Sequence, residues 1–347
     1  ENSFEGELPE SIANSTNLYE LRIFQNNLTG ALPKDLGKNS PLLWLDVSSN
    51  NFSGEIPANL CEKGVLLELL MIDNSFSGEI PASLGQCQSL NRVRLANNNF
   101  SGAVPDGLWG LPHVSLLDLK SNSFSGGIAK TIASASNLSS LILSSNKFSG
   151  DIPEEIGFLE TLLEFSGNDN VFSGSLPGSI VNLGQLGRLD LHDNALSGEL
   201  PKGIHSWKKL NELNLANNDL SGNIPPQIGS LSVLNYLDLS GNRLTGKIPN
   251  ELQNLKLNQL NLSNNRLSGD IPPLYAKVMY RNSFLGNPGL CGDIDGLCDG
   301  RSDRNNGYAW LLKSIFVLAG VVLIMGVLWF YWKYRNFRKV KLAIDKS

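Results

Sequence analysis

The sequence predicts an α/β-type solenoid, a right-handed superhelix with a parallel β-sheet on its concave face, followed by a cap and a single transmembrane helix. Three observations lead to this fold class. The motif Asn-x-[Phe/Leu]-[Ser/Thr]-Gly recurs with its glycine every 24 residues from Gly30 to Gly246. A Leu-x-x-Leu-x-Leu pattern precedes each motif, and one long apolar run covers 309–332. A fixed period over most of 347 residues indicates a repeat array rather than two ordinary globular domains.

Each repeat has the form Leu-x-x-Leu-x-Leu-x-x-Asn before its glycine, as at Leu210, Leu213, Leu215 and Asn218. This is the signature of leucine-rich repeats, whose leucines point into a core that neighbouring repeats close on both sides. The asparagines are expected to stack as a ladder and to satisfy backbone groups where the chain leaves each strand. The Ser-Gly-x-Ile-Pro sequence that follows resembles the plant-specific class of these repeats. We assign the array of about eleven repeats to 1–269.

Two repeats depart from the pattern. Ala129 stands where other repeats have proline, and Phe165 and Gly167 replace two strand leucines. We expect loose packing in that last strand. Cys61 and Cys87 lie in adjacent repeats, so both a bridge between them and two buried free thiols are open.

The residues after the array form a cap and a linker. The cap is expected over 270–300, because the last hydrophobic layer of an array needs a cover. Cys291 and Cys298 are seven residues apart and are predicted to form a disulfide within it. The segment 301–308 is a polar linker.

The apolar segment 309–332 contains one charged residue, Lys313, near its outer end. Its 24 residues would span about 36 Å as a helix, enough to cross a bilayer, whereas a buried helix of a soluble protein seldom has this length. The basic residues of 333–347 place that end in the cytosol and the repeats outside. The prediction is a single-pass type I protein of the plasma membrane.

The composition excludes several classes of function. A net charge of −5 gives no basic excess for nucleic acid. Asp190, His192 and Asp193 are a conceivable metal or acid–base cluster, but an exposed polar strand explains them more simply. We predict no catalytic residue, no metal and no cofactor in this chain. Sequons for N-glycosylation occur at Asn14, Asn27, Asn51, Asn99, Asn137 and Asn261.

The candidate ligand site lies on the strand that contains Arg92 and Arg94. Residues i and i+2 of a strand point the same way, roughly 6–7 Å apart, and two guanidinium groups side by side suit a carboxylate. An extended peptide would end there after crossing a groove whose candidate residues are Phe24, Trp44, Leu70 and Ile72. The alternative is that Glu68 and Asp118, one repeat away on either side, pair with the two arginines.

The sequence resembles the plant leucine-rich-repeat receptor kinases of the HAESA and HAESA-like group. The segments that carry the resemblance are 89–95 (Ser-Leu-Asn-Arg-Val-Arg-Leu), 109–112 (Trp-Gly-Leu-Pro), 207–215 (Trp-Lys-Lys-Leu-Asn-Glu-Leu-Asn-Leu), 255–263 (Leu-Lys-Leu-Asn-Gln-Leu-Asn-Leu-Ser) and 284–291 (Phe-Leu-Gly-Asn-Pro-Gly-Leu-Cys). The resemblance implies a receptor for small secreted peptide hormones, of the kind that control organ abscission. It implies that Arg92 and Arg94 hold the C-terminal carboxylate of the peptide.

The resemblance also implies partners and missing parts. A co-receptor kinase of the somatic-embryogenesis type would contact peptide and receptor near the C-terminal repeats. A hydroxyproline pocket would precede this chain, and a Ser/Thr kinase domain that uses ATP and Mg would follow it. Because the chain opens in mid-pattern, we expect a fragment of a longer receptor. A kinase-less receptor-like protein acting as decoy or scaffold is the alternative, and a secreted inhibitor is disfavoured by the apolar segment.

Overall fold

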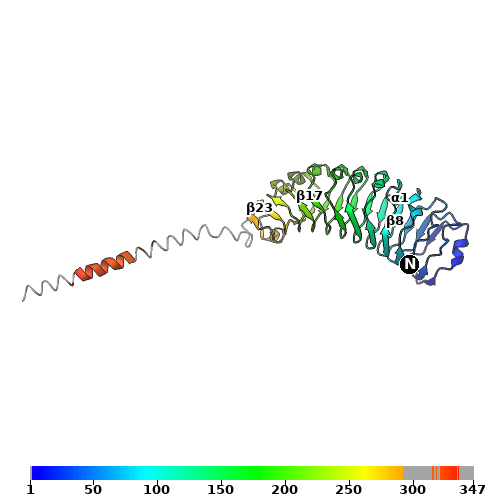
Figure 1. Cartoon of the computed structure of the whole chain (residues 1–347), viewed down its shortest axis with the longest axis horizontal. Helices are drawn as coiled ribbons and strands as arrows, with labels where there is room; N and C mark the ends of the chain where they lie inside the picture. The colour runs from blue at the N-terminus through cyan, green and yellow to red at the C-terminus, as the bar shows by residue number, and fades with distance from the viewer. Residues whose placement is uncertain (1, 292–314, 316–317, 319–320, 334, 336–347) are drawn as a thin grey trace, which may run out of the picture. The chain divides into compact units, whose positions relative to one another are not determined.

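The computed structural model describes residues 2–291, 315, 318, 321–333 and 335 (Figure 1). The chain divides into two compact units, Glu1–Leu297 and Cys298–Ser347. The first unit contains the repeat array. The second contains the described helical residues 321–333. Each unit is described by itself below.

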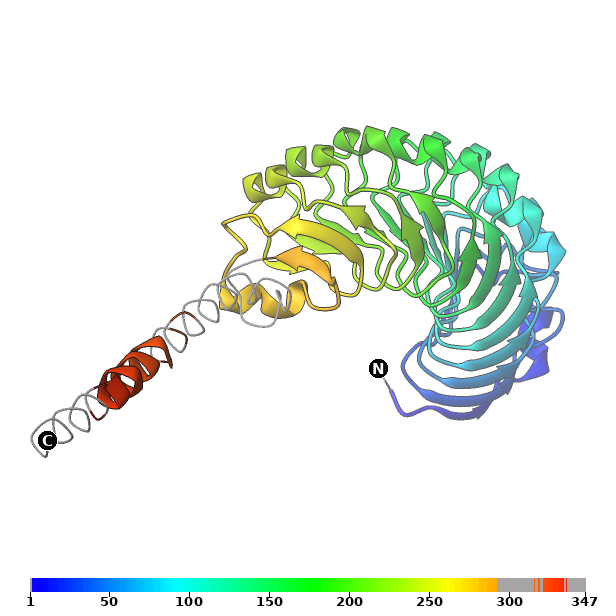
Figure 2. The same ribbon diagram turned by 60° about the vertical axis from the view of Figure 1, so that its left-hand side comes forward.

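The concave side of the array is a parallel sheet of eleven short strands, one from each repeat (Figure 2). The middle residue of each strand is buried and its two neighbours face outward, because successive side chains of a strand alternate. Adjacent strands pair in a register of 24 residues, so that Arg92 lies opposite Glu68 on one side and Leu116 on the other. The strands are β2 (Glu20–Arg22), β4 (Trp44–Asp46), β6 (Glu68–Leu70), β8 (Arg92–Arg94), β10 (Leu116–Asp118), β12 (Ser140–Ile142), β14 (Glu164–Ser166), β16 (Arg188–Asp190), β18 (Glu212–Asn214), β20 (Tyr236–Asp238) and β22 (Gln259–Asn261).

A second set of parallel strands follows the turn in each repeat. Its glycines have positive φ, and at Gly102 (φ 77°) an added Cβ would also lie 2.6 Å from Glu79 Cγ of the preceding repeat. The repeat glycine therefore answers both to the turn and to a close side-chain contact. The eight-stranded sheet consists of β1 (Glu5–Glu7), β3 (Asn27–Ala31), β5 (Asn51–Gly54), β7 (Ser75–Gly78), β9 (Asn99–Ala103), β11 (Ser123–Gly126), β13 (Lys147–Asp151) and β15 (Val171–Ser173). Two smaller sheets continue it, formed by β17 (Ser197–Glu199) with β19 (Asp219–Ser221), and by β21 (Thr245–Gly246), β23 (Arg266–Asp270) and β24 (Gly289–Cys291).

The convex side carries single helical turns rather than longer α-helices (Figure 2). Most begin directly after the repeat proline, which fixes φ and needs no N–H partner. Ala129 precedes η3 with φ −74°, so it adopts the same backbone without the ring. The 3-10 helices are η1 (Glu10–Asn14), η2 (Ala82–Gln86), η3 (Lys130–Ser134), η4 (Glu154–Phe158), η5 (Gly178–Asn182), η6 (Lys202–Ser206), η7 (Pro226–Ser230), η8 (Asn250–Asn254) and η9 (Val278–Ser283), and the α-helix is α1 (Asp106–Trp109).

Two ladders run along the core of the array. Phenylalanine rings at the same position of six repeats stack with centroids 5.9–6.3 Å apart, at Phe52, Phe76, Phe100, Phe124, Phe148 and Phe172. The predicted asparagine ladder is present. Asn98 donates to the carbonyls of Met71, Leu95 and Ala96, and its Oδ1 accepts the Phe76 N–H. Each asparagine thereby links neighbouring repeats through backbone groups that would otherwise be buried without partners.

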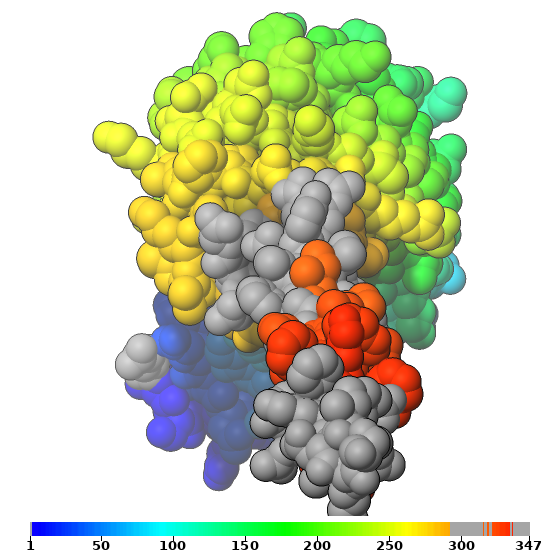
Figure 3. Space-filling view, turned by 90° about the vertical axis from the view of Figure 1, so that its left-hand side faces the viewer, coloured from blue at the N-terminus to red at the C-terminus, as the bar shows by residue number. Residues whose placement is uncertain are grey.

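The cap continues the array by one further rung. Asn287 donates to the carbonyls of Leu262 and Phe284 and accepts the Leu267 N–H, as the repeat asparagines do. β24 pairs in parallel with β23. Figure 3 shows the yellow residues of the last repeats and cap in front of the green middle of the array.

The expectation of loose packing at Phe165 and Gly167 is wrong. Phe165 is fully buried. An added Cβ at Gly167 would lie 3.0 Å from Leu191 Cδ2, 3.2 Å from Phe172 Cε2 and 3.5 Å from Phe165 Cε2. The phenylalanine ring and its neighbours therefore fill the space that a leucine occupies in other repeats.

Cys61 and Cys87 form a disulfide with Cα atoms 5.9 Å apart, which decides between the two alternatives for this pair. The bridge connects adjacent repeats on the convex side of the strand β8. The other predicted disulfide, Cys291–Cys298, depends on Cys298, which lies outside the described residues, as does the linker 301–308.

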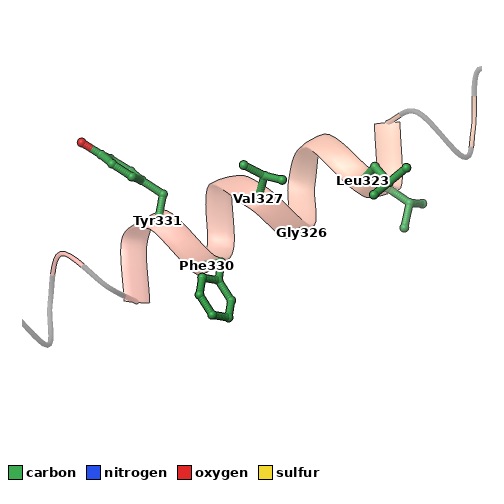
Figure 4. Close-up of a pocket in the computed structure, with 6 residues that line it drawn as sticks. Leu323, Gly326, Val327, Phe330 and Tyr331 are labelled. Carbon is green, nitrogen blue, oxygen red and sulfur yellow. The ribbon is translucent and has the colours of Figure 1, made fainter.

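The predicted segment 309–332 is described only in part. Within the portion of the chain that the structure covers, no helix reaches the length and hydropathy needed to cross a membrane. The described helical residues include a surface hollow along Leu323, Val327 and Tyr331 (Figure 4). All of its lining residues lie on this single helix, so the hollow is the outer surface of a helix and not a ligand cavity.

Candidate functional site

The strand β8 places Arg92 and Arg94 side by side on the concave face. Val93 between them is buried, and the two arginine side chains are 40% and 35% exposed. Both guanidinium groups thus face solvent on the inner surface of the array, on a strand whose backbone is paired on both sides. A rigid strand with two adjacent cations is well suited to a carboxylate, because the donors need little reorganisation to bind it.

Arg94 is held by a buried carboxylate. Its Nε and Nη2 donate to Asp118 Oδ2 of the next repeat, at 3.3 and 3.1 Å. The Asp118 side chain is only 5% exposed, and its Oδ1 accepts the Lys120 N–H at 3.3 Å. This pairing fixes one edge of the guanidinium and leaves Nη1 without a hydrogen bond to any described residue.

Arg92 is much less engaged. Its Nη1 lies 3.8 Å from Glu68 Oε1, which is an ion pair but beyond hydrogen-bond distance. Its guanidinium donates no hydrogen bond to the residues that the structure describes. The alternative weighed from the sequence is therefore half met: both arginines have an acidic neighbour, yet only Arg94 is hydrogen-bonded to it.

The four groove candidates lie on the N-terminal side of β8, in two different positions relative to the arginines. Leu70 lies directly opposite Arg94 in the register. Ile72 follows the end of the same strand, β6, and is partly buried. Trp44 and Phe24 lie further along, and the Arg22 guanidinium covers the Trp44 ring at 5.6 Å from its centroid. The structure brings Leu70 next to the arginine pair and leaves the two aromatic residues one to three rungs away.

A third concave arginine, Arg188, was missed in the sequence. It lies on β16 in the same position of its strand as Arg92, and it contacts three carboxylates: Asp190 at 3.1 Å, Glu212 at 3.3 Å and Glu164 at 3.7 Å. The signal was available as glutamates 24 residues before and after Arg188. Since the carboxylates outnumber the guanidinium, this cluster is a poor site for an anion.

The charges of this cluster shift its acid–base equilibria. Burial lowers the pKa of Arg188, but the hydrogen bond to Asp190 and the charges of Glu212 and Glu164 outweigh it and raise the pKa above its usual range. Burial raises the pKa of Glu212, and the charges of Asp190 and Glu164 add to this rise against the opposing effect of Arg188. Both directions follow from a half-buried site with an excess of negative charge.

The Asp190–His192 pair lies beside this cluster. His192 Nδ1 is 2.5 Å from Asp190 Oδ1, and its Nε2 is 3.6 Å from Asp193 Oδ2. Asp169 of the preceding repeat also approaches, so that possible ligand atoms of Asp169, His192 and Asp193 lie within 4.8 Å of one another. Both outer aspartates are exposed, and Asp169 already accepts the Asn168 amide. We assign no metal to this group.

The sequons occupy different surfaces of the array. The exposed residues Asn27, Asn51 and Asn99 begin the strands β3, β5 and β9. Asn14 and Asn137 are exposed at the end of η1 and before β12. Asn261 differs because its amide donates to Asp238 Oδ2 and Ser240 Oγ on the concave face.

Comparison with known proteins places these features in a family. The family model described as "Leucine Rich Repeat" matches residues 41–62, 137–159, 209–231, 233–255 and 256–277. Receptor-like protein kinase HSL1 of Arabidopsis thaliana is 67% identical over 97 residues, which are 28% of this chain and 10% of that protein. Receptor-like protein kinase 5 of the same plant is 59% identical over 91 residues, 26% of this chain and 9% of that protein.

Solved structures extend the similarity to most of the chain. The Arabidopsis receptor kinase HAESA, in complex with the peptide hormone IDA and the co-receptor SERK1, has a TM-score of 0.84 and 62% identity. The match covers 86% of this chain and 50% of the HAESA chain. The receptor PEPR1 with AtPEP1 has a TM-score of 0.69 and 35% identity over 84% of this chain and 48% of its own. The chain therefore spans about half the length of these receptor structures.

Proposed function

The chain belongs to the HAESA group of plant leucine-rich-repeat receptor kinases, and we propose that its concave face binds the C-terminus of a small secreted peptide hormone. The observation that carries the proposal is the pair Arg92 and Arg94, both accessible on the inner sheet, with the Arg92 guanidinium lacking a hydrogen bond to any described residue. A peptide carboxylate would supply the acceptors that these donors lack. The HAESA complex with IDA supports the same class of ligand.

The peptide would reach the arginines from the N-terminal repeats. Phe24, Trp44, Leu70 and Ile72 all precede β8, so an extended chain lying across β2 to β6 would contact them before ending at the arginines. Neighbouring rungs are about 4.8 Å apart, close to the rise of one and a half residues of extended peptide. Leu70, opposite Arg94, would contact the last side chains of the ligand.

We propose that a leucine-rich-repeat co-receptor kinase completes the complex, as SERK1 does in the HAESA structure. The repeats that follow β8 remain uncovered by a peptide that ends there, which leaves them for the co-receptor. The full-length receptor would carry a Ser/Thr kinase domain that uses ATP and Mg. The segment 309–332 would anchor it in the plasma membrane with the repeats outside, supported by its 24 apolar or weakly polar residues and the basic residues after it.

Titration of a longer ectodomain that contains these repeats tests the ligand site. The IDA peptide is compared as free acid and as C-terminal amide by calorimetry. Because each charge-assisted hydrogen bond contributes about 1.5–3 kcal/mol, the free acid is expected to bind at least tenfold tighter. Replacing Arg92 and Arg94 by alanine is expected to remove that preference. Equal affinity of the two peptide forms for the wild-type ectodomain would refute carboxylate recognition.

A further inference from the structure

The two carboxylates next to the arginine pair differ in every respect that governs their response to a ligand. Glu68 is 25% exposed in its side chain, stands 3.8 Å from Arg92 and accepts no hydrogen bond from a described residue. Asp118 is 5% exposed and accepts Arg94 Nε, Arg94 Nη2 and the Lys120 N–H. One carboxylate is free to move away from its arginine, and the other is fixed in the sheet.

We infer that Glu68 competes with the ligand for Arg92, whereas Asp118 is a positioning residue that orients Arg94 toward the ligand. The inference rests on the proposed function. A ligand carboxylate that approaches Arg92 displaces Glu68, because an exposed pair at this distance is weak and its side chain can turn into solvent. The same ligand does not displace Asp118, since its acceptors are already satisfied by three donors from the protein.

The hydrogen bonds to Asp118 determine which edge of Arg94 faces outward. With Nε and Nη2 engaged, the Nη1 edge is the part of the guanidinium that remains for a ligand. A long arginine side chain loses rotamer freedom when it binds, and Asp118 has removed much of that freedom beforehand. Its negative charge also repels a ligand carboxylate, so the two effects of Asp118 oppose each other. The buried, multiply bonded geometry favours the positioning effect.

Two substitutions that remove the same charge are therefore expected to act in opposite directions. Glu68→Gln removes the competitor and should tighten binding of the free-acid peptide up to about fivefold. Asp118→Asn keeps an acceptor but loses the charge that holds Arg94, and should weaken binding about tenfold. A change in net charge alone would move both variants the same way.

Asp238→Asn is the matched control. Asp238 occupies the same position on β20, and its Oδ1 accepts the Ser240 N–H at 2.9 Å, as Asp118 accepts the Lys120 N–H. Its recorded partners are Ser240 and the Asn261 amide, not an arginine. Asp238→Asn thus reports the loss of this local strand contact without an effect on the arginine pair, and peptide affinity should stay at the wild-type value.

The experiment measures IDA free acid and amide against wild type, the three single variants, Arg94→Ala and Arg94→Ala with Asp118→Asn. Support requires tighter binding by Glu68→Gln, weaker binding by Asp118→Asn with a smaller acid-to-amide ratio, and no further loss from Asp118→Asn once Arg94 is absent. Tighter or unchanged binding by Asp118→Asn overturns the positioning role, and unchanged or weaker binding by Glu68→Gln overturns the competitor role. If wild type itself fails to prefer the free acid, the proposed function has failed instead.

Discussion

Phe165 Cε2 lies 3.5 Å from the point where a Cβ of Gly167 would be, so that one residue fills the volume missing at the other. In most repeats both positions are leucine. Here a larger ring and a glycine share the space in the same strand region, and the ring is fully buried. The two departures from the repeat pattern therefore compensate each other.

This compensation predicts a non-additive pair of substitutions. Phe165→Leu alone should lower the free energy of unfolding by about 1–2 kcal/mol, because it leaves a cavity. Gly167→Leu alone should lower it by about 1–3 kcal/mol, because its Cβ would already lie 3.0 Å from Leu191 Cδ2. The double variant restores the repeat pattern and should lose at least 1 kcal/mol less than the sum. Urea denaturation measures all three, and additive losses would contradict the shared-space account.

The disulfide between Cys61 and Cys87 predicts a specific loss of stability. It joins adjacent repeats across a sequence separation of 26 residues. Replacing both cysteines by serine should lower the free energy of unfolding by about 3 kcal/mol. The measurement is the denaturation midpoint with and without reductant. Reductant should shift the wild type toward the double variant, and its effect on the double variant itself reports any contribution from other cysteines. A double variant as stable as the oxidised wild type would contradict this role.

Glu154 connects two neighbouring convex turns and predicts a dependence of stability on pH. Its carboxylate accepts the Gly178 and Ser179 N–H groups at 2.9 and 2.8 Å. Hydrogen bonds from the side chain and backbone of Ser179 and from the Gly178 N–H lower the pKa of Glu154 below its ordinary value of 4.5. Since the folded pKa is the lower one, the stabilisation is present above the unfolded pKa and disappears as pH falls through the folded pKa.

Glu154→Gln should therefore be less stable than wild type at pH 7 and similar to it near pH 3. The site is nearly exposed, so the difference at pH 7 should be only about 0.5 kcal/mol. Glu160→Gln is the control, because Glu160 is an exposed carboxylate of the same repeat. Urea midpoints at several pH values measure the effect, and a difference that persists at pH 3 would argue against the charge as its cause.

The repeat period and the alternation of side chains are sufficient to predict the framework of this protein. They assign Val93 to the core and Arg92 and Arg94 to the concave face, because a residue's parity on the strand follows from the buried leucines. The asparagine ladder follows from the same period. Each of these predictions depends on backbone geometry that every repeat shares.

The parts that were not predicted depend on contacts between repeats. The position before each ladder asparagine has positive φ, as at Asp73 (55°) and Asn97 (56°), and Asn97 donates to Asp73. The abundance of Asp, Asn, Ser and Gly at this position was the available signal. The period likewise fixes which residues are neighbours across strands, but the choice between a hydrogen bond, as at Arg94, and a looser pair, as at Arg92, depends on burial and rotamers.

Arg188 provides a test of whether strand position alone makes a carboxylate site. It has the same position on its strand as Arg92, but three carboxylates surround it. Arg188→Ala should leave the affinity for the free-acid peptide and its preference over the amide unchanged. It should lower the free energy of unfolding by about 1–2 kcal/mol at pH 7, because Asp190 loses a charge-assisted partner in a nearly buried site.

The same variant should regain stability as pH falls toward 5. Without the guanidinium, the pKa values of Glu164, Asp190 and Glu212 rise in the folded state, and that of Glu212 is already raised in the wild type. A carboxylate whose folded pKa exceeds its unfolded value destabilises the protein as pH rises through that window. Denaturation midpoints at pH 5 and pH 7 measure the change. A loss of peptide affinity in Arg188→Ala would show that the ligand extends beyond β8, and an equal loss of stability at both pH values would contradict the excess of negative charge.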